Sequence, residues 1–230
     1  MGDKSCMIQE HPQELLEFYN QNKDCQSPVY DNFGDSYHDE NCAYYPIKFD
    51  FDTELLLAEC QSIEDIYTPH REKDGKKKKG YGHDGWKSLT LHGIDKHKTE
   101  HYTQYGFNSL EEAGYHWTDA SDRVPHLTAF IKSLPYSQFD RVRIMRLAPG
   151  GYIMPHSDNK FQRAFSPLNI AINNPDGCHF VFKDRGIVPF VAGTGLVLDV
   201  GREHIVINQS SEVRYHIIVH GNYSPQFYKL

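Results

Sequence analysis

The chain has 230 residues, enough for one sizeable core, and 39% of them are hydrophobic, which favours a folded protein over a disordered one. Its formal net charge of −7 argues against a general binder of nucleic acids or acidic membranes, because phosphate binding requires a basic surface. The five cysteines show no CxxC spacing, and no apolar run resembles a signal peptide or a membrane span. We therefore expect a soluble cytoplasmic protein with neither a nucleic-acid nor a membrane partner.

Three helices and one strand are predicted in the first 140 residues. The helices are expected at residues 12–20, 51–67 and 125–134, and the strand at residues 86–93. Asp52 or Thr53 could cap the second helix, and Pro125 suits the first position of the third.

The rest of the chain is predicted to consist of short strands separated by turns. The strands are expected at residues 141–147, 152–156, 168–173, 178–183, 187–191, 195–200, 203–208 and 213–220. Turn-forming segments such as "APGG" and "NPDG" lie between them, and no helix does. This succession indicates a mostly β fold, an antiparallel sandwich or barrel of the double-stranded β-helix type, also called a jelly roll or cupin-like fold.

We interpret residues 1–230 as a single domain. Residues 121–222 would form the jelly-roll core. Residues 1–120 would be an N-terminal extension of helices and loops, whose helices brace one sheet.

A candidate metal site begins with His156 and Asp158, at the end of a predicted strand. Other H-x-D or H-x-E matches, at His38 and His70, fall in predicted loops and lack this strand context. Side chains at i and i+2 share one face of a strand, so His156 and Asp158 can converge on one ion. His204 begins a later strand directly after a tight turn and would supply the third ligand. Two imidazoles and one carboxylate suit Fe(II), and they leave coordination positions open for a cosubstrate and O₂.

Arg214 follows His204 by ten residues, after a predicted hairpin that returns the chain to the same neighbourhood. A guanidinium facing the interior of a barrel needs a negative partner, because an unpaired buried charge is costly. It could hold the far carboxylate of a 2-oxo acid that chelates the metal through its other end.

These residues match the H-x-D…H…R pattern of the Fe(II)/2-oxoglutarate oxygenases. Residues 141–222 resemble, more narrowly, the aspartyl/asparaginyl β-hydroxylase family, which includes hydroxylases of free proline. The segments that carry the resemblance are "RIMRLAPGGYIMPHSD", "LNIAINNPDGCHFVF" and "GREHIVINQSSEVRYHIIVHG". Over residues 86–140 the resemblance is weaker, and none is expected for residues 1–85.

The resemblance implies a hydroxylase that uses Fe(II), 2-oxoglutarate and O₂, with His156, Asp158 and His204 as metal ligands and Arg214 as cosubstrate anchor. Two features depart from the family. Peptide-modifying members usually have glycine where this chain has Asp158, so the chain resembles the branch with the full triad. The family's serine and histidine contacts to 2-oxoglutarate fall on Met145 and Asn169; Asn169 can still donate a hydrogen bond, whereas Met145 cannot.

The expected substrate is a small molecule, a free amino acid or another small metabolite with a carboxylate. Three residues are candidates for contact with it. Arg143 would bind the carboxylate or form a salt bridge at the rim, Trp86 would line the pocket or fill the core, and Arg163 follows the first ligands.

Three alternatives remain open from the sequence. The protein could hydroxylate a peptide in a groove that includes Tyr44, Tyr45 and Tyr67. It could be a catalytically silent jelly-roll binding module. A cupin-type isomerase or dioxygenase is a third, although those enzymes usually show three or more ligating histidines, whereas position 158 is Asp.

Overall fold

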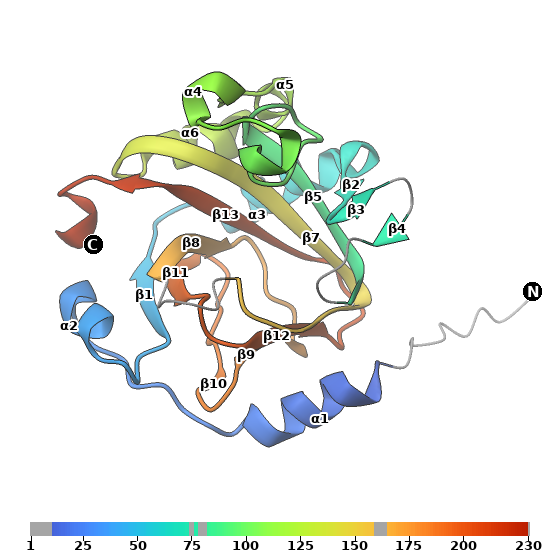
Figure 1. Ribbon diagram of the computed structural model, residues 1–230, viewed down its shortest axis with the longest axis vertical. Helices are drawn as coiled ribbons and strands as arrows, with labels where there is room; N and C mark the ends of the chain where they lie inside the picture. Colours follow the sequence, from blue (N-terminus) through green and yellow to red (C-terminus); the bar gives the residue numbers. More distant parts are fainter. Residues whose placement is uncertain (1–10, 74–75, 78–81, 159–164, 230) are drawn as a thin grey trace, which may run out of the picture.

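The computed structural model describes residues 11–73, 76–77, 82–158 and 165–229 (Figure 1). The helices are α1 (Gln13–Asn22), α2 (Phe33–His38), α3 (Thr53–Ser62), α4 (Leu110–Ala113), α5 (Asp119–Asp122) and α6 (Pro125–Ser133), with 3-10 turns at Glu64–Ile66, Tyr102–Tyr105 and Phe227–Lys229. The strands are β1 (Tyr44–Lys48), β2 (Thr68–Pro69), β3 (Glu72–Lys73), β4 (Lys76–Lys77), β5 (His83–Gly93), β6 (His116–Trp117), β7 (Tyr136–His156), β8 (Phe165–Ala171), β9 (Cys178–Phe182), β10 (Gly186–Ile187), β11 (Thr194–Asp199), β12 (His204–Asn208) and β13 (Arg214–Tyr223). The prediction of a mostly β jelly-roll fold is confirmed.

One curled antiparallel sheet contains all of these strands except β3 and β4, which pair with each other. Its main path runs β1-β11-β8-β13-β7-β12-β9-β10, and β5 also pairs with β7. The first half of β7 lies between β5 and β13, whereas its second half pairs with β12. The long strand β7 therefore belongs to both walls of the jelly roll (Figure 1).

The prediction of two strands at 141–147 and 152–156, separated by a turn, was wrong. Residues 148–151 stay within β7, because β5 pairs with the strand on both sides of them and shifts register between Asp84 and Trp86. Gly150 takes a φ of 70°, a conformation that favours glycine, so the expected turn becomes a bend within one continuous strand.

The helices cover the outer faces of the sheet. In Figure 1, α4, α5 and α6 lie over the outer side of β5 and β7, whereas α1 lies on the opposite side of the molecule, beneath β9 and β12. Leu56 of α3, Leu127 of α6 and Ile144 of β7 belong to one buried cluster between these helices and the sheet. Leu15 of α1 packs in a separate cluster with Ile205 and Ile207 of β12.

Most predicted elements lie where expected, with shifted ends. The helix expected at 51–67 ends at Ser62 and is followed by a 3-10 turn; the side chain of Asp52 caps it by accepting a hydrogen bond from the Leu55 amide. The strand expected at 187–191 is only Gly186–Ile187. Strand β1 was not predicted; it contains Pro46 and pairs with β11 at the edge of the sheet, where proline is tolerated. No described helix is long and apolar enough to cross a membrane.

Candidate active site

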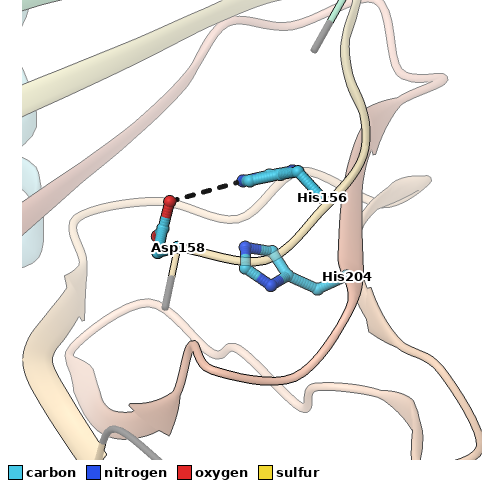
Figure 2. Close-up of side chains that lie close together, drawn as sticks. All are labelled: His156, Asp158 and His204. Carbon is cyan, nitrogen blue, oxygen red and sulfur yellow. Dashed lines mark ion pairs between the residues drawn. The ribbon is translucent and has the colours of Figure 1, made fainter. Parts of the chain in front are cut away.

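The three predicted metal ligands meet at one point (Figure 2). His156 ends β7 and His204 begins β12, and the two residues are direct partners in the antiparallel pairing of these strands. Their ring centroids are 4.2 Å apart, and the Nε2 atom of His156 lies 3.8 Å from Oδ1 of Asp158. One potential ligand atom from each residue lies within 4.8 Å of the other two. The long strand β7 and its return partner β12 thus place two imidazoles and a carboxylate around a common centre.

Backbone carbonyl groups fix the orientation of both imidazoles. Nδ1 of His156 donates to the Met154 carbonyl and Nδ1 of His204 donates to the Arg202 carbonyl, each over 2.8 Å. Since a carbonyl can only accept, Nδ1 carries the proton, and the lone pair of Nε2 is left for a metal. Burial lowers the pKa of both imidazoles, so they remain neutral at physiological pH. Both rings are in the protonation state that metal binding requires.

A cavity of about 350 Å³ opens beside the triad. Its apolar wall contains Phe180, Leu198, Val200 and Val206. Phe180 stacks on the ring of His204, with the ring centroids 4.7 Å apart, and so packs against one face of the imidazole. A cavity of this size suits a small ligand with few water molecules around it.

Arg214 lies deep in the molecule and is 1% exposed. It shares one face of β13 with His216, Ile218 and His220, which line the cavity, although Arg214 itself is not part of the cavity wall. Its Nε donates to the side-chain oxygen of Asn174, and its guanidinium stacks on Phe190. Its Nη2 has no hydrogen-bond partner among the described residues. Burial lowers the pKa of this guanidinium, and none of the ion pairs formed between described residues includes it.

Three of the four other predicted site residues lie in the wall of this cavity. Asn169, Trp86 and Arg143 line the same cavity as the triad. Trp86 also packs on His70 and against the interior apolar cluster, so it fills both roles considered from the sequence. Asn169 donates a hydrogen bond to the Pro167 carbonyl. Arg163 lies outside the described residues.

The aromatic groove considered for a peptide substrate is absent from the described residues. Tyr44, Tyr45 and Tyr67 are each at most 7% exposed, so the expectation that they line a groove was wrong. Tyr44 and Tyr45 belong to β1 and are held by its pairing with β11, while Tyr67 packs beside Tyr215 in the core.

A model of the aspartyl/asparaginyl β-hydroxylase family matches residues 51–222, well over half of the chain. The chain belongs to this family. The match confirms the resemblance inferred from the sequence, and with it a hydroxylase that depends on Fe(II), 2-oxoglutarate and O₂. It begins at residue 51, so the expectation that no resemblance precedes residue 86 was wrong.

Several solved structures resemble this β-hydroxylase family member at low identity. A prolyl hydroxylase from Trichoplax adhaerens, solved with a peptide of hypoxia inducible factor, is 10% identical with a TM-score of 0.49; the alignment covers 93% of this chain and 94% of the other. A 2-oxoglutarate/Fe(II) oxygenase from Burkholderia pseudomallei is 13% identical with a TM-score of 0.47, covering 86% and 97%. A prolyl-4-hydroxylase from Pseudomonas putida is 15% identical with a TM-score of 0.43, covering 77% and 90%. No curated protein matches the chain by sequence.

The cavity of this β-hydroxylase family member is lined by residues that sequence reasoning missed. His216 and His220 stand on the Arg214 face of β13, and Arg141 stands on the Arg143 face of β7. The alternation along each strand could have identified all three, once Arg143 and Arg214 were taken to point inward. Glu100 and Arg71 also line the cavity but come from loops, where no periodicity indicates a direction.

Proposed function

We propose that the protein is an Fe(II)- and 2-oxoglutarate-dependent dioxygenase that hydroxylates an unactivated C–H bond of a small metabolite with a carboxylate, such as a free amino acid. The observation that carries the proposal is the triad of His156, Asp158 and His204, with both Nε2 lone pairs turned towards one point beside a cavity. Two neutral imidazoles and one carboxylate are a donor set that suits Fe(II) and leaves positions for other ligands. The residues therefore fit this metal.

Arg214 is the proposed anchor of the cosubstrate. A buried guanidinium with one Nη atom lacking a partner among the described residues can donate to a carboxylate that reaches it from the neighbouring cavity. Asn174 holds its Nε, so the side chain is already oriented before a ligand arrives. Asn169 can donate from its amide to the same ligand once it leaves the Pro167 carbonyl.

The residues around the metal position the substrate and exclude water. When bound, the iron and the cosubstrate supply the oxidation of the C–H bond by O₂. Phe180, Val200 and Val206 form an apolar wall beside the triad, which limits the access of water to the reacting carbon. Arg143 and Trp86 line the same cavity and would orient the substrate by a carboxylate contact and by a flat apolar surface.

A small substrate agrees with the dimensions of the site. A volume of about 350 Å³ is at the lower end of ligand pockets, and it has to accommodate the cosubstrate as well. We also propose that the chain forms one oxygenase domain, since β1 and β5 lie within the first 120 residues and pair with β11 and β7 of the later segment.

The test is spectroscopic. Fe(II) and 2-oxoglutarate added to the protein without oxygen should produce the visible charge-transfer band of a chelated complex. The band should disappear in His204→Ala, require far more 2-oxoglutarate in Arg214→Ala, and persist in the surface control His126→Ala. If the intact protein gives no band and metal analysis finds no iron bound, the dioxygenase is refuted and the binding module becomes the better interpretation.

A further inference from the structure

The imidazole of His216 carries a polar atom without a protein partner in the wall of the cavity. His216 is 9% exposed and lines the same cavity as the triad. Its Nδ1 atom is buried and has no hydrogen-bond partner among the described residues. Because nearly all buried polar atoms of folded proteins are hydrogen-bonded, an unpartnered atom on a residue of a cavity wall indicates a group that a ligand satisfies.

The cross-strand neighbours of His216 cannot satisfy its imidazole. In the pairing of β13 with β7 and β8, His216 lies opposite Met145 and Ala171. Paired residues of antiparallel strands point to the same face of a sheet, so these two side chains flank the imidazole directly. A thioether is only a weak acceptor, and a methyl group offers neither a donor nor an acceptor. The cavity is the remaining direction from which a partner can reach the ring.

The charges around His216 favour an anionic partner. Burial lowers the pKa of the imidazole, and the guanidiniums of Arg214 and Arg143 lower it further. The ring is therefore neutral at physiological pH and carries one N–H group. The same positive potential that opposes protonation of the ring repels an ammonium group and attracts a carboxylate. A neutral imidazole can donate its N–H to such an anion without adding to the positive charge.

Arg214, the proposed cosubstrate anchor, lies on the same strand as His216. It precedes His216 by two residues, so both side chains point to the cavity-facing side of β13 and their Cα atoms are about 7 Å apart. Asn174 holds Nε of Arg214, whereas Nη2 has no hydrogen-bond partner in the part of the chain that the structure describes. The two oxygen atoms of a carboxylate accept several hydrogen bonds, so one carboxylate can accept from both side chains.

We propose that His216 donates a hydrogen bond from Nδ1 to the far carboxylate of 2-oxoglutarate, beside the guanidinium of Arg214. The proposal rests on the proposed dioxygenase function and adds a second cosubstrate-binding residue to Arg214. Donors from two neighbouring side chains fix the rotation of the carboxylate as well as its position. His216 would then help the site to distinguish 2-oxoglutarate from a 2-oxo acid that has no second carboxylate.

Calorimetric titration of the Mn(II)-loaded protein without oxygen tests the proposal. 2-Oxoglutarate is compared with 2-oxopentanoate, which has the same chain and the same chelating end but a methyl group in place of the far carboxylate. Wild-type protein should bind 2-oxoglutarate roughly a hundredfold more tightly. In His216→Leu this preference should fall roughly tenfold, the range expected for a lost hydrogen bond to a charged group, while the affinity for 2-oxopentanoate stays within about threefold. Measuring both ligands in both proteins separates this one contact from general damage to the site.

Two further variants assign the loss to the imidazole N–H. His216→Asn keeps an amide N–H near the place of Nδ1 and should retain a larger preference than His216→Leu does. Tyr215→Phe is the matched control at the adjacent position, because it removes a hydroxyl that donates to Glu64 on the helix face of the same strand. It should keep the wild-type preference. Thermal unfolding establishes that each variant is folded.

Several outcomes overturn the proposal. An unchanged preference in His216→Leu, or an equal loss of affinity for both ligands, means that the imidazole does not bind the far carboxylate. A preference in His216→Asn no larger than that in His216→Leu, or the same loss in Tyr215→Phe, removes the assignment to the N–H group. If neither 2-oxoglutarate nor N-oxalylglycine, its inert analogue, binds to the wild-type protein, the proposed dioxygenase function has failed instead, and the two failures are distinguished.

Discussion

The two faces of β7 and β13 differ in chemistry although they belong to the same strands. Towards the helices, Ile144 of β7 and Ile217 of β13 are fully buried in an apolar cluster. Towards the cavity, the neighbouring positions carry Arg143 of β7 and His216 of β13. Because successive side chains of a strand point to opposite faces, a residue that packs in the core is followed directly by one that faces the cavity. Substitutions on the helix face should change the free energy of unfolding, and those on the cavity face should change ligand binding.

The largest effect is expected from removing a metal ligand. His156→Ala should weaken Mn(II) binding roughly a thousandfold, because a site with three ligands loses one of its donors. The free energy of unfolding without metal should change by about 1 kcal/mol, the usual contribution of a hydrogen bond such as the one that His156 donates to the Met154 carbonyl. Calorimetry with Mn(II) and urea unfolding of the metal-free protein measure the two quantities. Metal affinity equal to that of the wild type would remove His156 from the site.

Substitutions on the helix face should have the opposite effect, lowering stability while leaving metal binding nearly unchanged. Ile144→Ala should lower the free energy of unfolding by about 2–5 kcal/mol, and Ile144→Val by about 0.5–1.5 kcal/mol, because each deletes apolar contacts with the helices. Mn(II) affinity of the folded variants should stay within about threefold of wild type, which is roughly half the free-energy change of a tenfold step. Urea unfolding and calorimetry again separate the effects. A large loss of metal affinity in a folded Ile144→Val protein would contradict the separation of the two faces.

The next effect in size is expected from substituting Arg214, which is buried on the cavity-facing side of β13. Arg214→Gln should weaken binding of N-oxalylglycine to the Mn(II)-loaded protein by roughly 10- to 100-fold, the cost of a lost charge-assisted hydrogen bond pair. The protein should gain stability or lose little, since a buried guanidinium without a carboxylate is replaced by a neutral amide. Arg146→Gln, whose guanidinium pairs with Glu64 on the helix face, should leave the affinity unchanged. An equal loss in both variants would mean that general charge, and not the Arg214 position, binds the ligand.

The sequence predicted the fold class and the strands that carry His156 and His204, because local signals agreed there. His156 lies at the end of a strand, His204 follows a tight turn, and the pairing of β7 with β12 makes them partners. The bend at residues 148–151 was mistaken for a turn because glycine and proline mark both features. Only the pairing of distant β5 with both halves of β7 distinguishes them. Pairing between elements far apart in sequence leaves no periodicity to interpret.

The part of the cavity wall that contains Arg141 and Arg143 was harder to predict for a related reason. Arg141 and Arg143 are two positions apart, so their common face follows from alternation, but their shared acceptor does not. The Thr99 carbonyl comes from a loop 42 residues before Arg141, and a backbone oxygen carries no mark in the sequence. Sites built from side chains on strands can thus be predicted better than sites completed by loop backbone.

The smallest expected effect tests how the loop before β12 holds the triad. Asp199 is 1% exposed, and its Oδ2 lies 3.0 Å from Nε of Arg202, whose carbonyl accepts the hydrogen bond from His204. Asp199→Asn keeps the shape but removes the charge that holds Arg202, so the carbonyl and the His204 ring should lose orientation. Mn(II) binding should weaken roughly tenfold, the lower end of what such supporting contacts contribute to metal affinity. Glu203→Gln, in an exposed pair with Lys183 beside His204, is the matched control and should bind Mn(II) as the wild type does. Because the control also removes a negative charge that acts on His204, a loss shared by both variants would assign the effect to electrostatics. A loss confined to Asp199→Asn would assign it to the orientation of His204.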